Sequence, residues 1–343
     1  MKKQTIKIIA GIVLAVIIIV AFGLGLKYIE KSGQKKGDNT RTQHSMYVNL
    51  VIDENEYETN HNIESYLLFG TDENGSAADS PEGYHGGMVD FLMLIMLDKT
   101  TERYAFVEID RNTMFDVTMI APDGSMDYSS FQQICGANWY GHTPVQGAEN
   151  MTKTVSELFG GLPINGYFAI GIEDFHRLND AVGGVTVTIP DDDLSKADPA
   201  FKKGAEVKLS NKQAELFVRS RMSYGNGTNE SRLARQRIFL NALLRDLKVK
   251  VKNDPKVIDK IFNELEDFAV TDMNAGIISK IANQVTKSEK IEGSDDVGIV
   301  QLEGEHTTGK HLDDGIEHEE FYCDYEALAS MLEKAIGLKN ITY

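Results

Sequence analysis

One stretch of this acidic chain concentrates positively charged side chains at spacings that suit anion binding. The chain has 343 residues and a formal net charge of −17, yet the stretch from Phe217 to Lys248 contains seven arginine or lysine residues. A local basic cluster in an acidic protein indicates a dedicated anion site rather than a generally adhesive surface. The alternative is a solvated helix face paired with Glu230 and Asp246, since exposed ion pairs contribute little to stability.

The expected local structure places these arginines on shared faces. The segment Phe217 to Arg221 is expected to be a strand, whose period of two puts Arg219 and Arg221 on one side. A turn with two glycines follows, and then a helix on which residues spaced i, i+3 and i+4 share a face. The polar residues on that face are Arg232, Arg235 and Gln236. Four arginines and one glutamine could therefore surround a phosphate group.

Two aspartates lie beside the ends of expected strands. Asp72 follows an apolar run, and Asp90 directly precedes another, with a Gly- and Ser-rich loop between them. Two carboxylates that converge on one place suit a hard divalent cation such as Mg²⁺ or Mn²⁺, which prefers oxygen ligands and phosphates. The alternative is that each is an ordinary turn aspartate, because aspartate is common in turns. A third polar group, Asp110-Arg111-Asn112, follows the next apolar run.

Apolar runs and helical patterns alternate along the rest of the chain. The expected strands are Tyr66–Phe69, Phe91–Leu97, Tyr104–Ile109, Gly166–Ile172, Val185–Ile189 and Gly298–Leu302. The expected helices are Glu149–Phe159, Glu173–Ala181, Pro255–Phe268, Asn274–Val285 and Asp324–Ile336. The uninterrupted apolar run at 91–97 is typical of a strand buried on both faces. This alternation predicts an α/β fold with a central sheet covered by helices on both faces.

The N-terminal segment has the composition of a membrane anchor. Three lysines precede a run from Ile8 to Leu26 that contains no charged residue, and this length nearly matches a bilayer core of roughly 30 Å. A cleaved signal peptide would have a shorter apolar region, about 7–15 residues, and a small-residue cleavage site. Residues 1–29 are therefore expected to form a cytoplasmic stub and transmembrane helix, 30–47 a polar linker, and 48–343 one domain. Basic residues flank both ends of the run, so charge alone leaves the orientation open.

Several classes of site and function are excluded by composition. The acidic net charge excludes broad nucleic-acid binding, which needs an extended basic surface. The sequence has no Cys/His cluster typical of zinc, no G-x-S-x-G elbow and no Walker-type phosphate loop. Among the scattered histidines, His306 and His311 are expected in a solvated loop, and the alternative is adventitious metal binding together with the nearby acidic residues. The two cysteines, Cys135 and Cys323, fit either redox compartment, so whether they form a disulfide stays open.

Together these motifs resemble the signature of the LytR-CpsA-Psr family, membrane-anchored enzymes that attach glycopolymers to the bacterial cell wall. Members of that family carry a G-x-D segment, an R-S-D segment, a P-R-D at a strand end and an arginine-rich stretch. The corresponding segments of this chain are Gly70-Thr71-Asp72, Met88-Val89-Asp90, Asp110-Arg111-Asn112 and the stretch from Phe217. The resemblance extends through Val182–Val185 and the terminal helix, and it implies a mixed central sheet.

The resemblance also implies roles for particular residues. Asp72 and Asp90 are expected to hold Mg²⁺ or Mn²⁺, and Asp90 is also a candidate to help deprotonate an incoming hydroxyl. Arg111 is expected to act in catalysis. The residues expected to bind a pyrophosphate are Arg111, Arg219, Arg221, Arg232, Arg235 and Gln236. Phe239 and Leu243 are candidates for contact with a polyprenyl tail, although apolar residues such as these are more often ordinary core.

This chain departs from the family pattern at three positions. Met88 replaces the arginine of R-S-D, Asn112 replaces an aspartate, and Asn229 replaces an aspartate before Arg232. Asparagine accepts and donates hydrogen bonds but carries no negative charge and cannot act as a base. The comparison with the family pattern therefore supports pyrophosphate binding more strongly than it supports full catalytic activity.

The resemblance implies transfer of a glycopolymer, such as teichoic acid or capsule, from an undecaprenyl-diphosphate-linked donor to peptidoglycan. Such an enzyme would be a single-pass protein of a Gram-positive cell membrane, with its large domain outside the membrane. Two alternatives stay open: a catalytically weakened scaffold or regulator that binds polyprenyl phosphates, and a lipid-diphosphate hydrolase. The sequence does not indicate which polymer or acceptor hydroxyl is used, or the oligomeric state.

Overall fold

The computed structural model describes residues 48–71, 85–121, 123–171, 179–180, 182–220, 235, 238–239, 242–243, 245–246, 269–295, 298–311 and 315–342. The membrane anchor expected at residues 8–26, the linker at 30–47 and the helix expected at 255–268 lie outside these residues. Most of the helix expected at 173–181 does too. None of the helices within the described ranges has the length and apolar character needed to cross a membrane.

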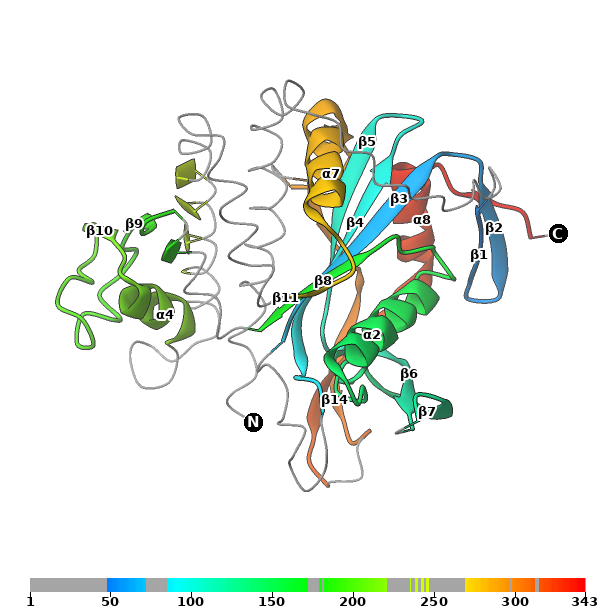
Figure 1. The fold of residues 1–343 in the computed structure, drawn as a ribbon, viewed down its shortest axis with the longest axis horizontal. Helices are drawn as coiled ribbons and strands as arrows, with labels where there is room; N and C mark the ends of the chain where they lie inside the picture. The colour runs from blue at the N-terminus through cyan, green and yellow to red at the C-terminus, as the bar shows by residue number, and fades with distance from the viewer. Residues whose placement is uncertain are drawn as a thin grey trace.

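A seven-stranded mixed sheet forms the centre of the fold (Figure 1). Its strands are β3 (Ile63–Thr71), β4 (Val89–Asp98), β5 (Arg103–Ile109), β8 (Tyr167–Gly171), β11 (Ala269–Thr271), β12 (Glu289–Lys290) and β13 (Ile299–Gln301). The order is β11-β8-β3-β4-β5-β12, and β13 also pairs with β5. The pairs β3–β8, β5–β12 and β5–β13 are parallel, and the other pairs are antiparallel. The strands predicted at 66–69, 91–97, 104–109, 166–172 and 298–302 are confirmed within a few residues.

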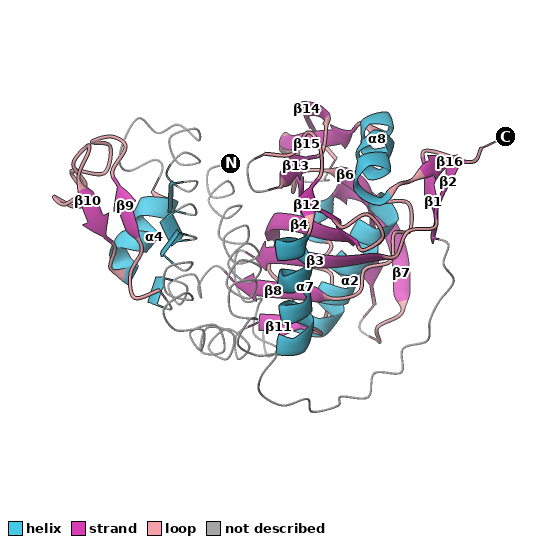
Figure 2. Cartoon of the chain, turned by 90° about the horizontal axis from the view of Figure 1, so that it is seen from above, coloured by secondary structure: helices cyan, strands magenta, loops and turns pink. Residues whose placement is uncertain are grey.

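Both faces of the sheet are covered, as the alternation of strands and helices predicts. Along β4, Phe91, Met93, Ile95 and Leu97 belong to one buried cluster. The residues between them, Leu92, Leu94 and Met96, belong to a second cluster on the opposite face. Helix α7 (Ala275–Lys287) contributes to the first cluster, and helices α2 (Pro144–Leu158) and α8 (Tyr325–Ile336) contribute to the second. Figure 2 shows these three helices packed around the strands.

Each of these helices begins at a side-chain cap. The side chains of Thr143, Asn274 and Asp324 accept hydrogen bonds from backbone N–H groups in the first turns of α2, α7 and α8. Such caps satisfy N–H groups that have no partner inside the helix. Helix α2 begins five residues before the predicted start at Glu149, because Thr143 caps it and Pro144 fits its first turn.

The remaining described elements are smaller. They are β1 (Val48–Ile52), β2 (Asn55–Thr59), β6 (Met114–Ile120), β7 (Met126–Gln133), the 3-10 turn η2 (Ile134–Gly136), β9 (Thr186–Thr188), β10 (Glu206–Lys208), α4 (Asn211–Arg219), β14 (Gly304–Gly309), β15 (His318–Cys323) and β16 (Lys339–Asn340). Strands β6 and β7 form one antiparallel hairpin, and β14 and β15 form another. Both hairpins lie next to the end of β5 that carries Asp110 and Arg111.

The strand predicted at 217–221 is wrong. Residues 217–219 form the end of helix α4, and Ser220 is its extended C-terminal cap. The helix begins with a reciprocal capping box between Ser210 and Gln213. Its buried residues Ala214, Phe217 and Val218 recur at helical spacing, so tertiary packing selects the helix over the local strand preference.

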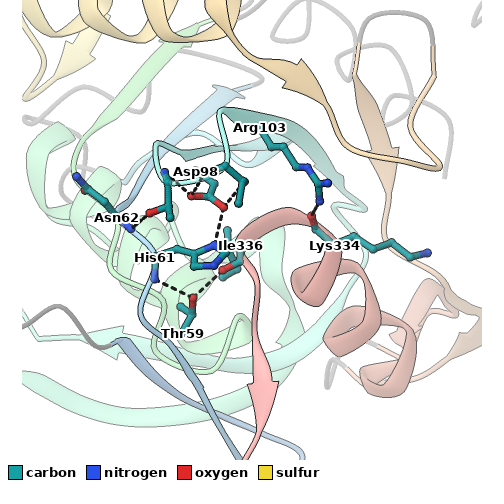
Figure 3. A network of polar contacts seen from close by, with 9 residues as sticks. Thr59, His61, Asn62, Asp98, Arg103, Lys334 and Ile336 are labelled. Carbon is teal, nitrogen blue, oxygen red and sulfur yellow. Dashed lines mark hydrogen bonds and ion pairs between the residues drawn. The ribbon is translucent and has the colours of Figure 1, made fainter.

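The far end of the sheet is held by a polar network around Asp98 (Figure 3). The buried Asp98 carboxylate accepts hydrogen bonds from the backbone N–H of Thr100 at 2.8 Å and pairs with His61 Nδ1 at 2.7 Å. The hydroxyl of Thr59 donates to the carbonyl of Ile336 at 2.7 Å. The network therefore joins three segments: the β2–β3 connection, the β4–β5 turn and the C-terminal end of α8. All three lie at the end of the sheet opposite the candidate site.

Candidate functional site

The start of β4 and the end of β5 bring Asp90 and Arg111 together. These strands are antiparallel, with Leu92 opposite Ile109. Continuing this register by two residues places Asp90 opposite Arg111. The Arg111 Nη1 group donates a hydrogen bond to Asp90 Oδ1, and the two side chains are 5% and 1% exposed. The structure therefore joins the two residues that the resemblance assigned to catalysis in one buried ion pair.

A third side chain, that of Cys135, completes the surroundings of Arg111. The Arg111 Nη2 group lies 3.2 Å from the Cys135 sulfur, and the Cys135 backbone N–H donates to the Arg111 carbonyl. Burial raises the pKa of the Cys135 thiol, and Arg111 only partly counteracts this. Burial alone would lower the pKa of Arg111, but Cys135 and Asp90 outweigh it, so the pKa lies above its usual value. The guanidinium is held permanently charged beside a carboxylate and a buried sulfur.

A small pocket of about 130 Å³ opens beside this ion pair. Besides Asp90 and Arg111 it is lined by Glu108, Ile109, Asp110, Gln301, Leu302, His306 and Phe321. His306, which the sequence placed in a solvated loop, lies on β14 with its ring 4.8 Å from that of Phe321. His306 Nε2 lies 3.8 Å from Asp110 Oδ2. The pocket thus combines one buried cation with several carboxylates and an imidazole.

Asp110 links the pocket to the backbone of the following turn. Its Oδ1 atom accepts a hydrogen bond from the Asn112 N–H at 2.7 Å, and its carbonyl accepts from the Thr113 hydroxyl. Burial raises the pKa of the Asp110 carboxyl, although the Asn112 N–H, His306 and Arg111 act in the opposite direction. Asp110 therefore retains its proton at a higher pH than an exposed aspartate does.

The predicted phosphate-binding residues are described only in part. Arg219 is the last residue of α4, and its side chain lies outside the description, as do Asp72, Arg221, Arg232 and Gln236. Arg235 is described and is 1% exposed. No hydrogen bond or ion pair within the described residues joins it to Asp90 or Arg111. Whether the other arginines gather at one phosphate site thus stays a prediction.

Arg235 holds the chain segment that follows α4. Its Nε group donates to the Phe217 carbonyl at 3.1 Å, and its Nη2 group donates to the Ser220 carbonyl at 2.6 Å. Its Nη1 group is buried without a hydrogen-bond partner, at 3.9 Å from Asp193 Oδ2. Burial lowers the pKa of Arg235, and Asp191 and Asp193 partly offset this. Arg235 thus fixes the backbone on both sides of Arg219.

Comparison with known proteins identifies the family. The family model described as LytR_cpsA_psr matches residues 23–334, which is most of the chain. The chain belongs to the LytR-CpsA-Psr family.

Curated relatives from two bacterial genera are similar to this chain. A polyisoprenyl-teichoic acid–peptidoglycan teichoic acid transferase TagU of Bacillus cereus is 30% identical over 181 residues, which are 53% of this chain and 52% of that protein. The same-named protein of Oceanobacillus iheyensis is 27% identical over 244 residues, 69% of this chain and 68% of that protein. The match therefore spans about half the length of the Bacillus cereus relative.

Solved structures share the fold. The protein gbs0355 of Streptococcus agalactiae superposes with a TM-score of 0.56 and 20% identity, covering 82% of this chain and 90% of that one. TagV of Bacillus subtilis gives a TM-score of 0.52 and 20% identity, covering 81% of this chain and 98% of that one. The predicted α/β fold with a mixed central sheet is confirmed.

The structure accounts for one departure from the LytR-CpsA-Psr pattern. Asn112 Oδ1 accepts a hydrogen bond from Gln133 Nε2 at 2.9 Å, and the Asn112 carbonyl accepts from the Phe321 N–H at 2.9 Å. Its Nδ2 group lies 3.5 Å from Glu319 Oε2. An amide donor beside Glu319 is favourable, whereas an aspartate at this position would place its carboxylate beside that of Glu319. Asn112 therefore joins β7 and β15 to the turn that carries Arg111.

The second departure from the family pattern, Met88, contributes to the packing of the hydrophobic core. Its half-buried side chain packs against the buried cluster that includes Val89 and Leu92. Methionine adapts well to irregular gaps of this kind. The third departure, Asn229, lies outside the described residues.

Of the two aspartates expected to hold a divalent cation, Asp90 is described and Asp72 lies outside the described residues. Thr71, the last described residue before Asp72, pairs with Val89, the residue before Asp90, in an antiparallel register. Mg²⁺ is commonly bound by one or two carboxylates together with substrate phosphates. The described residues contain no group of three His, Cys, Asp or Glu side chains that could hold a metal by themselves. Whether Asp72 and Asp90 hold a cation together with a phosphate group thus stays a prediction.

Sequence reasoning missed the surroundings of the ion pair. The sequence indicates Cys135 only as a disulfide candidate and gives no signal for Glu108, Gln301 or Phe321. Both cysteines are thiols in the structure. Cys135 and Phe321 reach the site through η2 and β15, which are far from Arg111 in the sequence, and no local pattern signals these contacts.

Proposed function

We propose that this protein transfers a glycopolymer, such as a teichoic acid or a capsule-like polymer, from an undecaprenyl-diphosphate-linked donor to peptidoglycan. The buried Asp90–Arg111 pair beside a pocket is the observation that carries this proposal. Membership of the LytR-CpsA-Psr family and the names of the curated transferase relatives support it.

The proposed reaction is a phosphoryl transfer, so charge stabilisation is its main demand. The acceptor hydroxyl attacks the phosphorus attached to the glycopolymer, the phosphoanhydride bond breaks, and the lipid phosphate leaves. Negative charge spreads over the non-bridging oxygens in the transition state and onto the leaving phosphate. Arg111 is a fixed cation in a nearly dry site, where its attraction to such charge is stronger than in water.

We assign to Asp90 the role of general base, which accepts the proton of the acceptor hydroxyl. Its carboxylate lies at the pocket and is oriented by Arg111, so it can accept the proton as the new ester bond forms. Asp110 is less suited to this role, since its Oδ1 atom is occupied by the Asn112 N–H.

A divalent cation, Mg²⁺ or Mn²⁺, would be held by Asp72 and Asp90 together with the donor diphosphate. When bound, such an ion would neutralise part of the diphosphate charge. The remaining charge would be met by the arginine-rich segment: Arg219, Arg221, Arg232, Arg235 and Gln236. Arg235 fits this assignment because it fixes the backbone around Arg219.

The same proposal includes the place of the protein in the cell. Residues 8–26 would anchor the chain in the cell membrane, with residues 48–343 outside the cytoplasm. This position would keep the site near a donor that is itself bound to the membrane.

The direct test supplies both substrates to the purified full-length chain. A lipid-diphosphate oligosaccharide and peptidoglycan are incubated with the protein, with and without Mg²⁺. We expect polymer on peptidoglycan, and we expect its amount to fall when Mg²⁺ is removed with EDTA. Arg111→Gln should abolish transfer, whereas Arg103→Gln at the exposed opposite end of β5 should leave it unchanged. Transfer by the Arg111→Gln variant at the wild-type rate would refute the assignment of the site.

Met88 favours a second candidate, a weakened relative that binds polyprenyl phosphates without efficient transfer. Its side chain packs on the core where the family pattern has a cation. Tight binding of the lipid diphosphate without turnover would support this candidate, and release of phosphorylated sugar would support a hydrolase. Met88→Arg should raise turnover if the lost cation limits catalysis, with Met88→Gln as the uncharged control.

A further inference from the structure

A second and larger cavity lies on the other side of β13, beside α8. Its volume is about 250 Å³. Its apolar lining comes from β13 and the residue after it, Val300 and Leu302, and from α8, Leu328 and Met331. Ligand sites of proteins commonly have volumes of roughly 300–1,000 Å³. A cavity slightly below this range has room for one or two small residues of a ligand, but not for a polymer.

The rim of this cavity carries charges of both signs. Glu292 and Glu303 supply two exposed carboxylates, and Lys334 supplies an exposed ammonium group on α8. Figure 3 shows the Lys334 side chain extending away from the Asp98 network, with its backbone carbonyl accepting a hydrogen bond from Arg103 at 3.4 Å. An apolar floor with an ammonium and two carboxylates at its edge matches a ligand that carries both charges. It does not match a purely apolar lipid tail, which would desolvate three charged groups.

The cavity borders the pocket of the Asp90–Arg111 pair. Gln301 and Leu302 line both spaces. The Gln301 Nε2 group donates a hydrogen bond to Glu108 Oε2 at 2.8 Å, and Glu108 also lines the Asp90–Arg111 pocket. The larger cavity and the Asp90–Arg111 pocket are therefore separated by the side chains of Gln301 and Leu302. A molecule bound in the larger cavity could present an attached group to Asp90.

We propose that this cavity binds the short peptide of the peptidoglycan acceptor. This inference rests on the proposed function and names the part of the acceptor that the protein recognises. A peptide of this kind carries amino and carboxylate groups and small apolar side chains. Its carboxylate would pair with Lys334, its amino group with Glu292 or Glu303, and its methyl groups would lie over Leu302 and Leu328.

The consequence is that acceptor recognition depends on the peptide as well as on the glycan. The attached glycan would extend toward the Asp90–Arg111 pocket, where one of its hydroxyl groups would receive the polymer. Glycan from which the peptides have been removed would lack the charged groups that the rim recognises. It should therefore be a poorer acceptor at equal hydroxyl concentration.

The test compares two acceptor fragments with the full-length protein. Isothermal titration calorimetry measures binding of a disaccharide-peptide from peptidoglycan and of the same disaccharide without its peptide. We expect the fragment with its peptide to bind at least about tenfold more tightly, a difference of about 1.4 kcal/mol. Equal affinity of the two fragments would overturn the proposal.

Two variants place the interaction in this cavity. Ser330→Trp puts a bulky side chain at an exposed position of the lining, and Lys334→Glu reverses the single positive charge of the rim. Each should weaken binding of the disaccharide-peptide about tenfold or more. Glu333→Trp on the same helix and Lys339→Glu on β16 are matched controls, since neither residue lines the cavity, and both should bind as the wild type does. Wild-type affinity in both Ser330→Trp and Lys334→Glu would also overturn the proposal.

A separate measurement keeps this inference distinct from the proposed function. Binding of the lipid-diphosphate donor should be unchanged in Ser330→Trp and Lys334→Glu, while attachment of polymer to intact peptidoglycan should slow. If the wild type binds the disaccharide-peptide but transfers nothing, the proposed transfer fails and the peptide site stands. If the wild type transfers polymer but the cavity variants transfer at its rate, the peptide site fails and the transfer stands.

Discussion

The Arg111 guanidinium donates a hydrogen bond to the sulfur of Cys135 across a distance of 3.2 Å. Cys135 is fully buried and lies in η2, directly after the β6–β7 hairpin. The same guanidinium holds Asp90. The position of the proposed catalytic carboxylate is therefore coupled to a hairpin that contributes no charged group to the pocket.

This coupling predicts that Cys135→Ala affects both stability and transfer. Loss of the sulfur leaves a buried donor of Arg111 without this acceptor, which costs about 1–3 kcal/mol. Urea unfolding should show this loss, and the transfer rate should fall as Arg111 shifts. Cys135→Ser restores an acceptor and should recover part of both. Cys323→Ala is the control, because Cys323 is half-buried and makes no contact with Arg111; an equal effect of both alanine variants would contradict this coupling.

The Asp90–Arg111 pair predicts a separation of stability from activity. Asp90→Ala removes one partner of a buried ion pair, which costs about 3–5 kcal/mol. Replacing both residues, by Asp90→Leu with Arg111→Met, removes both charges and should regain much of that stability without regaining transfer. Urea unfolding and the transfer assay give the two readouts. A loss of unfolding free energy below about 1 kcal/mol in Asp90→Ala would contradict this, because it would show that the pair contributes no more than an exposed ion pair does.

The prediction from Asp110 concerns pH. Burial raises the pKa of its carboxyl in the folded protein above the unfolded value of about 4. The folded state therefore binds this proton more tightly, so the contribution of Asp110 to stability is full below pH 4 and is lost as pH rises through the raised pKa. Asp110→Asn keeps an oxygen that can accept the Asn112 N–H and removes the titration. The variant should become more stable than the wild type as pH rises from 4 to neutral, and urea unfolding across that range measures the difference. A gain in stability confined to acidic pH would show that the pKa of Asp110 is not raised by folding.

Local patterns in the sequence were sufficient to predict the central strands. The apolar run at 91–97 predicts β4, because a strand buried on both faces has no polar alternation. Once β4 and β5 form an antiparallel pair, Asp90 and Arg111 must meet, since they lie opposite each other two residues beyond the Leu92–Ile109 pair. This part of the site could be predicted because the residues are close in sequence and the strands are regular.

The parts that could not be predicted depend on contacts between distant segments. Cys135 and Phe321 approach Arg111 only because η2 and β15 hydrogen-bond to the turn at 111–113. The error at Phe217 has a different cause, because β-branched and aromatic residues there favour a strand locally. The capping box of Ser210 and Gln213 was the available signal for the helix that the structure contains.

The C-terminal cap of α8 gives a prediction about the far end of the sheet. Gly337 has a φ of +64°, and a Cβ atom at this position would lie 2.2 Å from the His61 ring. Gly337→Ala therefore meets two penalties: a left-handed backbone, which costs about 1–2 kcal/mol, and a clash with a ring held by Asp98.

Gly204→Ala separates these two penalties. Gly204 has a φ of +80°, and a Cβ atom there would meet no atom within 4 Å, so this variant carries the backbone cost alone. Urea unfolding should show a larger loss for Gly337→Ala than for Gly204→Ala. Combining Gly337→Ala with His61→Ala should bring the cost of the glycine change back to the Gly204→Ala value, because the ring is then absent. Equal losses in the two single variants would show that the His61 ring moves aside without cost and that Asp98 does not hold it in place.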